Sequence, residues 1–364
     1  MYALVRPLAF TLSPASAHAA GMAVLGPLEH VAPLREAVRA LLRVGDPRLA
    51  TRVLGLDFAT PVGLAAGFDK NARRARALAS LGFGHVELGT VTARPQAPNP
   101  APNLFRLPGD RALVNRLGFP NDGARGVCAR IARVKGEIGA PVGVSIGKSR
   151  AVGIEPIEPA IADYLESFAE ARAVADFVVV NVSSPNTKDL RAMQGTELAR
   201  ALLSAIASAN GAPGGPRRVP LLVKIAPDLG DAELEALLEV VEGCGIDGVV
   251  ATNTTVARRG LRADAAAIDA IGAGGLSGEP LRARSLEVVA RVRARLGKKF
   301  AVVGVGGVSR AEHAAAMLRA GADLVQIYTG FVYEGPGAAS AIARGLVETL
   351  DRERLASIRD LAPA

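Results

Sequence analysis

The stretch AVVGVGGVSRAEHAAAMLRAGADLVQIYTG, residues 301–330, contains the repeating unit that decides the fold. An apolar run opens it, a helical stretch follows from Ala311 to Ala320, and a second apolar run begins at Leu324. Short apolar runs that alternate with helical stretches are typical of a parallel sheet covered by helices. Glycine or polar residues follow both runs directly, which marks the point where the chain leaves each predicted strand.

Working outward, eight apolar runs of this kind occur, and helical stretches such as Asp231–Val241 separate them. Eight strand–helix units predict an α/β fold of the closed (β/α)8, or TIM, barrel type, which needs roughly 250 residues. An open doubly wound sheet is disfavoured because no GxGxxG motif opens a first helix. We therefore expect a helical extension at 1–50, the barrel at 51–350 and a tail at 351–364. The runs are residues 62–66, 86–89, 142–146, 177–180, 221–225, 249–251, 301–304 and 324–327.

Composition excludes several functional classes. The net charge of +8 comes from basic residues spread along the chain, so no nucleic-acid arm is predicted. The charge is most simply that of a solvated surface, and attraction to anionic lipid or to an anionic substrate stays open as an alternative. Cys128 and Cys244 lack CxxC spacing, and the four histidines form no HxxxH pair, so we expect no metal site.

The first 50 residues predict two short helices, of which one is capped by Ser13 with Pro14 at its first position. The other, at about 33–44, is amphipathic. It fits a helix lying in a membrane interface, or a helix packed on the barrel with its arginines in solvent. Its apolar positions are Leu34, Val38, Leu41 and Leu42, and its arginines are Arg35, Arg39 and Arg43.

The same region contains Ala17-His18-Ala19, which is similar to a signal-peptidase site. Pro7, Ser13 and Pro14 interrupt the preceding apolar stretch, so cleavage is not expected. No segment offers the roughly 18 continuous apolar residues of a spanning helix, so we expect peripheral membrane contact without crossing.

Polar or Gly-rich residues stand at the C-terminal ends of the eight runs. A single polar residue after a strand ordinarily belongs to a turn. Polar or Gly-rich residues after all eight strands instead favour an active site, because barrel enzymes have their active sites at the C-terminal ends of the strands. The last two sets follow strands seven and eight, where barrels bind phosphate through backbone N–H groups, although glycine also serves tight turns. The sets are Asp69–Lys70, Thr90, Ser145, residues 181–186, Lys224, residues 252–254, 304–307 and 328–330.

Lys224 lies inside an apolar strand, where a charge needs an anionic partner. That partner is either the electron-rich end of a reduced flavin or a carboxylate, for which Glu87 and Asp69 are the candidates. Lys70 adds a cation for a substrate carboxylate. Ser184 has no His or acidic residue near it in sequence, and no GxSxG motif is present, so a serine hydrolase is disfavoured.

Four asparagines fall at loops or strand ends. Asparagine both donates and accepts hydrogen bonds, so several facing one mouth would suit a planar ring with alternating C=O and N–H groups, such as a pyrimidine. Each one alone is an ordinary turn residue. They are Asn115, Asn181, Asn186 and Asn253.

Seven segments, in this order, resemble those of class 2 dihydroorotate dehydrogenases, and the resemblance spans residues 2–335. Ser184 and the N-terminal helices both favour class 2, because class 1 relatives have Cys at the base position and lack the helices. The segments are AAGFDK (65–70), NRLGF (115–119), NVSSPNT (181–187), KIAPD (224–228), ATNTT (251–255), GGLSG (274–278) and VQIY (325–328).

The resemblance implies oxidation of dihydroorotate to orotate in pyrimidine biosynthesis, with FMN as cofactor. Ser184 would be the general base that takes the C5 proton, while the C6 hydride goes to flavin N5. A relay through Thr187 and water would carry the proton away, and Phe119 would screen solvent. The residues implied for FMN are Ala66, Gly67, Phe68, Asp69, Lys70, Thr90, Ser145, Asn181, Lys224, Thr252, Gly278, Gly307, Tyr328 and Thr329. Those implied for dihydroorotate are Lys70, Asn115, Arg116, Leu117, Gly118, Phe119, Asn181, Asn186, Asn253 and Thr254.

The family likewise implies a quinone tunnel formed by the N-terminal helices, with His18, Arg106 and Tyr328 at the quinone site. The corresponding location is the cytoplasmic face of a bacterial cell membrane, with peripheral attachment. One departure concerns Ser145, where the family usually has Asn. Serine is shorter, so water would replace its direct contact with flavin or substrate.

Two rival functions differ in their residue requirements. Another FMN barrel enzyme, such as a 2-hydroxy-acid oxidase, would need a catalytic His at the barrel mouth. His85 instead begins the second predicted strand, and His313 lies in a predicted helix. A non-catalytic module that binds FMN or a phosphate ligand would require neither Ser184 nor the four asparagines.

Overall fold

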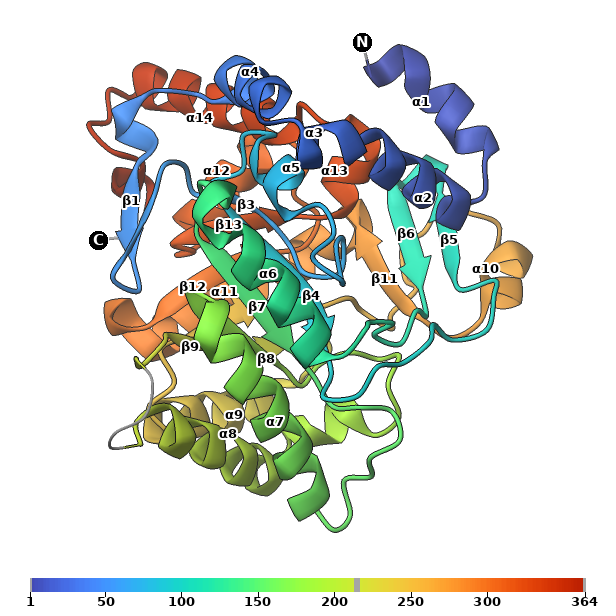
Figure 1. Cartoon of the computed structure of the whole chain (residues 1–364), viewed down its shortest axis with the longest axis vertical. Helices are drawn as coiled ribbons and strands as arrows, with labels where there is room; N and C mark the ends of the chain where they lie inside the picture. The colour runs from blue at the N-terminus through green and yellow to red at the C-terminus, as the bar shows by residue number, and fades with distance from the viewer. Residues whose placement is uncertain (1, 213–216, 363–364) are drawn as a thin grey trace.

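The computed structural model describes residues 2–212 and 217–362. Eight parallel strands close into a barrel in the order β10-β12-β13-β3-β4-β7-β8-β9 (Figure 1). Each strand coincides with one of the eight predicted runs, so the barrel prediction is confirmed. The barrel strands are β3 (Val62–Leu64), β4 (His85–Val91), β7 (Val142–Ile146), β8 (Phe177–Asn181), β9 (Leu221–Ile225), β10 (Gly248–Ala251), β12 (Ala301–Val305) and β13 (Leu324–Ile327).

Successive side chains of each strand point alternately into the barrel and outward to the helices, which gives two hydrophobic cores. In β8, Val179 points into the barrel and packs with Leu222 and Val303, whereas Val178 and Val180 pack outward against the helices. Aliphatic side chains make up most of both layers. The helices are α5 (Ala75–Ala79), α6 (Ala124–Ile138), α7 (Glu158–Val174), α8 (Thr196–Asn210), α9 (Asp231–Gly243), α10 (Ala265–Ile271), α11 (Arg282–Leu296), α12 (Ala311–Arg319), α13 (Thr329–Glu334) and α14 (Ala338–Glu353).

Two small antiparallel sheets lie outside the barrel and were not predicted. The strands β1 (Thr51–Val53) and β2 (Leu56–Phe58) form a hairpin. In the second sheet, β6 (Ala112–Asn115) pairs with both β5 (Leu104–Leu107) and β11 (Gly275–Gly278). This sheet places Asn115 opposite Gly275 and so brings a segment remote in sequence to the mouth of the barrel.

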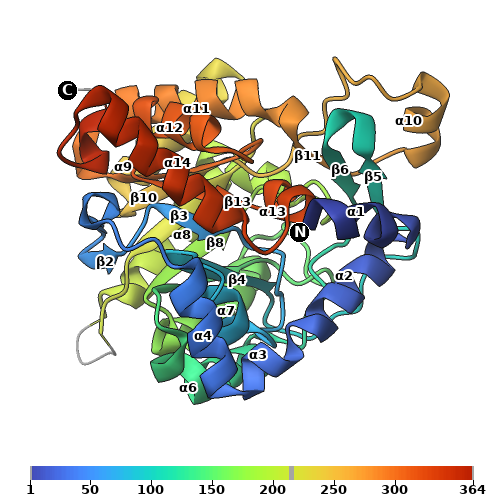
Figure 2. The same ribbon diagram turned by 90° about the horizontal axis from the view of Figure 1, so that it is seen from above.

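The N-terminal extension has four helical segments, so the expectation of two short helices was wrong. They are α1 (Tyr2–Thr11), α2 (Pro14–Val24), α3 (Gly26–His30) and α4 (Ala32–Leu42), and they run along one side of the molecule (Figure 2). Ser13 caps α2 by accepting a hydrogen bond from the Ser16 N–H, as predicted. None of the described helices is long and apolar enough to cross a membrane.

Arg35 and Arg39 of α4 face the barrel, which corrects the alternative of a packed helix with its arginines in solvent, while contact of this helix with a membrane interface stays a prediction. Arg35 is buried, and its Nη2 donates to Glu137 Oε2 on α6 at 3.1 Å. Arg39 Nη2 donates to the Ile138 carbonyl at the C-terminus of the same helix, at 3.1 Å. Leu34 and Leu41, expected on a packed apolar face, are 43% and 76% exposed.

The residues expected to form a C-terminal tail are partly folded onto the barrel. Helix α14 continues to Glu353, and a 3₁₀ turn follows at Ile358–Leu361. Ile358 and Leu361 are buried in the main hydrophobic core. Residues up to Leu361 therefore belong structurally to the barrel unit.

Candidate active site

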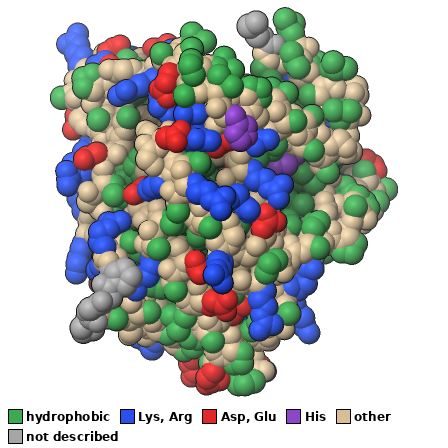
Figure 3. Space-filling view, in the orientation of Figure 1, with side chains coloured by type: hydrophobic (Ala, Val, Ile, Leu, Met, Phe, Trp, Pro, Cys, Tyr) green, Lys and Arg blue, Asp and Glu red, His purple; other side chains and the backbone are tan. Residues whose placement is uncertain are grey.

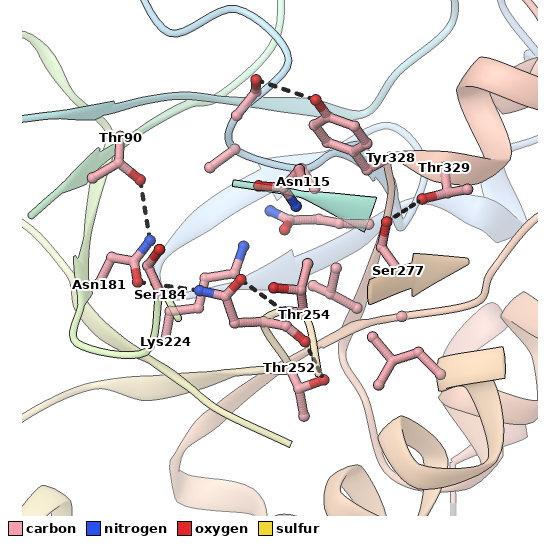
Figure 4. Close-up of a pocket in the computed structure, with 18 of the residues that line it drawn as sticks. Thr90, Asn115, Asn181, Ser184, Lys224, Thr252, Thr254, Ser277, Tyr328 and Thr329 are labelled. Atoms are coloured by element: carbon pink, nitrogen blue, oxygen red, sulfur yellow. Dashed lines mark hydrogen bonds between the residues drawn. The ribbon is translucent and has the colours of Figure 1, made fainter. Parts of the chain in front are cut away.

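A cavity with about 940 Å³ of empty space opens at the C-terminal ends of the strands. Residues within or directly after every barrel strand except β7 line it, together with residues of β6 and β11 (Figure 4). Of the predicted site residues, the lining includes Ala66, Gly67, Lys70, Thr90, Asn115, Leu117, Gly118, Phe119, Asn181, Ser184, Asn186, Lys224, Thr252, Asn253, Thr254, Gly278, Gly307, Tyr328 and Thr329.

At one end of the cavity, three glycine-containing segments pack backbone to backbone. A Cβ on Gly307 would lie 2.4 Å from Arg282 Cβ, and one on Gly278 would lie 2.4 Å from the Arg111 carbonyl oxygen. A Cβ on Gly330 would lie 2.3 Å from the Val308 carbonyl oxygen. A side chain is excluded at each of these three glycines, so backbone groups form part of this end of the cavity, next to the N-terminus of α13. Such a cradle suits a phosphate group.

Lys224 extends from β9 into the cavity and is buried. It has no hydrogen bond or ion pair with any residue that the structure describes. The two carboxylates proposed as partners are engaged elsewhere: Glu87 accepts from Gln326 Nε2 at 2.8 Å, and Asp69 accepts from the backbone N–H groups of Arg73 and Arg74. The ion-pair alternative for Lys224 was therefore wrong, and its charge is available to a ligand.

The four asparagines meet, as predicted, around the cavity. Asn186 Nδ2 donates to Asn115 Oδ1 at 2.9 Å, which joins the loop after β8 to strand β6. Asn181 Nδ2 donates to Thr90 Oγ1 at 3.1 Å. Asn253 Nδ2 donates to Ser183 Oγ at 3.0 Å. These bonds fix the amide planes and leave other lone pairs and N–H groups for a planar ligand.

Ser184 is 5% exposed and lines the cavity together with Lys224 and Thr254 (Figure 4). Its Oγ accepts a hydrogen bond from the Asn186 backbone N–H at 3.3 Å. No His or carboxylate that the structure describes contacts it, so a hydrolase triad is absent from this part of the chain. Thr187 Oγ1 is buried without a partner three residues further on.

Lys70 is held beside the cavity by its own loop, where its Nζ donates to the Gly67 carbonyl. Burial lowers the pKa of Lys70 to about 8, and the neighbouring charge of Asp69 opposes that shift. Burial also raises the pKa of Asp69, although backbone N–H donors oppose the shift. Asp69 does not line the cavity, and it shapes the loop that presents Lys70.

Three further predicted residues lie just outside the cavity lining. Ser145 Oγ is 2.9 Å from Thr90 Oγ1, so it supports a cavity residue instead of facing the cavity. Arg116 donates to the Pro102 and Ile271 carbonyls and braces the loops around the mouth. Phe68 contacts Tyr328 edge to face, with ring centroids 5.8 Å apart.

The predicted quinone residues form two separate contacts. The His18 ring lies 5.1 Å from Phe68, which links helix α2 to Tyr328. Burial lowers the pKa of His18 to about 4, and the Lys70 charge acts in the same direction. Arg106 instead donates to the Phe10 and Leu12 carbonyls and stacks over the Phe10 ring, which anchors the end of α1.

Sequence reasoning missed several residues of the cavity, notably Gln326, Ser277 and Leu281. Gln326 lies in β13, and its Nε2 also approaches His85 Nε2 at 3.3 Å. Its Oε1 is buried without a partner. A glutamine inside an apolar strand is the same signal that identified Lys224, so Gln326 could have been found from the sequence.

The comparisons with known proteins agree with this geometry. Residues 48–350 match the family model described as dihydroorotate dehydrogenase. The chain is 48% identical over 346 residues to a protein of Thermobifida fusca named dihydroorotate dehydrogenase (quinone), covering 94% of this chain and 91% of that protein. A Streptomyces griseus protein of the same name is also 48% identical, over 100% of this chain and 98% of that protein.

The chain belongs to the quinone-type dihydroorotate dehydrogenases. Family membership gives it dihydroorotate dehydrogenase (quinone) activity, an oxidation in pyrimidine biosynthesis. The crystal structure of ligand-free DHODH from Eimeria tenella superimposes with a TM-score of 0.81 at 34% identity, covering 91% of this chain and 98% of that one. The predicted family is thereby confirmed. Dihydroorotate dehydrogenases typically use FMN.

Proposed function

We propose that this chain oxidises dihydroorotate with Ser184 as general base, with FMN as the resident cofactor, and that quinone reoxidises the cofactor at the N-terminal side. The observation that carries the proposal is the gathering of Ser184, Lys70, Lys224 and the asparagines around one cavity that ends in a glycine-lined cradle. A non-catalytic phosphate-binding module would need the cradle but not the other groups.

The residues present fit FMN. The cradle of Gly278, Gly307 and Gly330 would take the phosphate, and the buried Lys224 offers an unpaired cation for the electron-rich part of the ring. When bound, FMN supplies the two-electron acceptor and passes those electrons to quinone. The other residues proposed to hold it are Ala66 to Lys70, Thr90, Asn181, Thr252, Tyr328 and Thr329, with Ser145 acting through Thr90.

The asparagines and Lys70 would hold the substrate. The Lys70 ammonium meets the carboxylate of dihydroorotate, and the amides of Asn115, Asn181, Asn186 and Asn253 match the alternating donors and acceptors of the pyrimidine ring. The loop from Leu117 to Phe119 closes one wall of the cavity. Arg116 would act indirectly, by holding that loop against the Ile271 carbonyl.

Ser184 Oγ would remove the proton from C5 while the hydride leaves C6, so that a C5–C6 double bond forms. Serine is a poor base, and its own proton must leave as the C5 proton arrives. Thr187 Oγ1, which is buried and has no partner, is the next hydroxyl along this loop and suits a relay to solvent. Phe119, which is 8% exposed, lies at the cavity and would limit direct access of water.

The N-terminal helices would carry the quinone site and the membrane contact. Exposed apolar residues concentrate there, and hydrophobic surface gathers over the region of α1 and α2 (Figure 3). Quinone resides in the bilayer, so its entry must face lipid, and an exposed apolar helical surface fits peripheral attachment. The large exposed hydrophobic residues of this region are Leu4, Val5, Leu8, Leu12, Val24, Val31, Leu34 and Leu41.

Single-turnover chemistry tests the proposal. The FMN-loaded protein, mixed with dihydroorotate without oxygen, should form one orotate for each FMN reduced, as measured by chromatography and flavin absorbance. Protein that binds FMN and orotate but forms no orotate would refute the catalytic role of the cavity.

A further inference from the structure

Arg191 lies seven residues after Ser184, in a 3₁₀ turn at Leu190–Gln194, and it does not line the cavity. Its guanidinium donates three hydrogen bonds to three different loops. Nε donates to the Ser183 carbonyl at 3.1 Å, Nη2 to the Thr254 carbonyl at 2.8 Å, and Nη1 to Asp228 Oδ2 at 2.7 Å. One planar group thus joins the loops that follow β8, β9 and β10.

Asp228 completes this junction from the other side. Its Oδ1 accepts from Thr255 Oγ1, and its Oδ2 also accepts from the Val256 N–H at 3.2 Å. The side chains of Arg191 and Asp228 are 24% and 22% exposed, so this pair is more enclosed than an ordinary surface ion pair. Exposed pairs contribute little, but a bidentate or multiply bonded arginine fixes geometry.

The loops that Arg191 joins carry the reacting groups. Ser183, whose carbonyl it binds, directly precedes Ser184, and Thr254 itself lines the cavity. On the cavity side, Asn253 Nδ2 donates to Ser183 Oγ at 3.0 Å, which links the same two loops a second time. The loops are therefore held together by an amide inside the cavity and by a guanidinium behind it.

We propose that Arg191, oriented by Asp228, is a positioning residue that sets Ser184 Oγ against the substrate held by Asn253 and Thr254. The proposal rests on the proposed role of Ser184 as the base. The loops have no strand or helix to fix them between Ser183 and Asn186, so their geometry depends on such bonds. A displacement of about 1 Å at a reacting group costs on the order of 10²-fold in rate.

Arg191→Ala tests this through the two half-reactions of the FMN-loaded protein. Stopped-flow reduction by dihydroorotate should slow by about 10²-fold. FMN affinity, the flavin midpoint potential and reoxidation by quinone should stay within about twofold of the unmodified protein, since nothing that the guanidinium binds belongs to those functions. Millimolar guanidinium chloride should restore part of the reduction rate, because the free ion fits the same three acceptors. Arg191→Lys should not restore it, since an ammonium lacks the planar fork.

Arg319→Ala is the matched control, because Arg319 pairs with Glu353 at 2.6 Å on the surface away from the cavity. It should leave both half-reactions unchanged. Asp228→Asn keeps the shape of the junction and should slow reduction by about tenfold, and the double variant with Arg191→Ala should be no slower than Arg191→Ala alone. If Arg191→Ala fails to hold FMN, the rate of FMN reduction in Asp228→Asn tests the positioning role instead.

Reduction at the unmodified rate in Arg191→Ala, or in Asp228→Asn where that variant decides, would overturn the positioning role. Equal slowing of reduction and quinone reoxidation, without rescue by guanidinium, would also overturn it, because that pattern indicates general destabilisation. Failure of the proposed role of Ser184 is distinguishable, since Ser184→Ala would then reduce FMN at the unmodified rate, whatever the outcome in Arg191→Ala.

Discussion

Two lysines of the cavity illustrate how single residues prepare this site for an anion. Lys224 is buried without a partner among the residues that the structure describes, and Lys70 has a lowered pKa because it is desolvated. Both arrangements cost free energy unless a ligand supplies negative charge. The sequence could predict the need for a partner at Lys224, since it interrupts an apolar strand. It could not predict that Glu87 accepts a hydrogen bond from Gln326 and not from Lys224, because this pairing depends on the directions of the side chains inside the barrel.

At Lys70 the pKa gives a pH-dependent prediction. Burial lowers the pKa of Lys70 to about 8 in the protein without ligand, and a bound carboxylate would raise it, so orotate binding takes up a proton above pH 8. The dissociation constant of orotate should be constant from pH 6.5 to 7.5 and rise toward tenfold per unit above pH 8. Lys70→Ala should weaken binding by about 3 kcal/mol at pH 7 and abolish this pH dependence. Flavin-absorbance titration measures both, and identical profiles for the two proteins would exclude the assignment.

Ser184→Ala should bind FMN and orotate but reduce FMN at least ~10²-fold more slowly, because the base is missing. Ser184→Cys should keep part of the rate and shift the pH optimum downward, since a thiol has a lower pKa than a hydroxyl. Stopped-flow absorbance across a pH series checks both variants. Near-unmodified reduction by Ser184→Ala would show that another group takes the proton.

At the scale of elements, local patterns and long-range pairings differ in what a sequence reveals. Each barrel strand is a local apolar run, so all eight were predictable. The pairing of β6 with β11 joins Asn115 to Gly275 and has no local signal. The periodicity of α4 showed two faces but could not show which face meets the barrel. Arg35 and Arg39 face it because Glu137 and the end of α6 offer acceptors there.

The attachment of α3 can be tested at Glu29, which is 4% exposed. Its carboxylate accepts from Arg76 Nε at 3.0 Å and from the Ala77 N–H at 3.0 Å. Glu29→Ala leaves Arg76 partly unpaired and should lower the free energy of unfolding by about 3 kcal/mol. Asp57→Asn, which breaks an exposed pair with Arg52, should change it by less than about 0.5 kcal/mol. Urea unfolding compares them, and equal effects would mean that this contact does not stabilise the extension.

At the scale of the whole molecule, the proposed sites for the two substrates lie apart. The polar cavity opens at the barrel mouth, while the exposed apolar residues cluster on the N-terminal helices, joined to the cavity through His18, Phe68 and Tyr328. Dihydroorotate, an anion, would enter from water, and quinone from lipid. Composition could not reveal this separation, because it depends on where the helices dock.

Removal of α1 and α2 should separate the two half-reactions, reduction by dihydroorotate and reoxidation by quinone. None of the residues of α2 is buried, whereas Leu25, Glu29 and Arg35 beyond it are, so a chain beginning at Leu25 keeps the packed part of the extension. It should be reduced by dihydroorotate at the full rate, lose rapid reoxidation by long-chain quinone and no longer sediment with anionic liposomes. His18→Ala and Arg106→Ala should show a milder form of the same split. Full quinone turnover by the FMN-loaded truncated chain would refute the assignment.

The most direct test of the whole account is the absorbance of the full-length protein, followed without oxygen. Dihydroorotate should bleach the oxidised flavin spectrum within one turnover. Subsequent addition of quinone should restore that spectrum rapidly, whereas fumarate and NAD should not. A spectrum that dihydroorotate leaves unbleached, or that fumarate or NAD restores as fast as quinone does, would contradict the account.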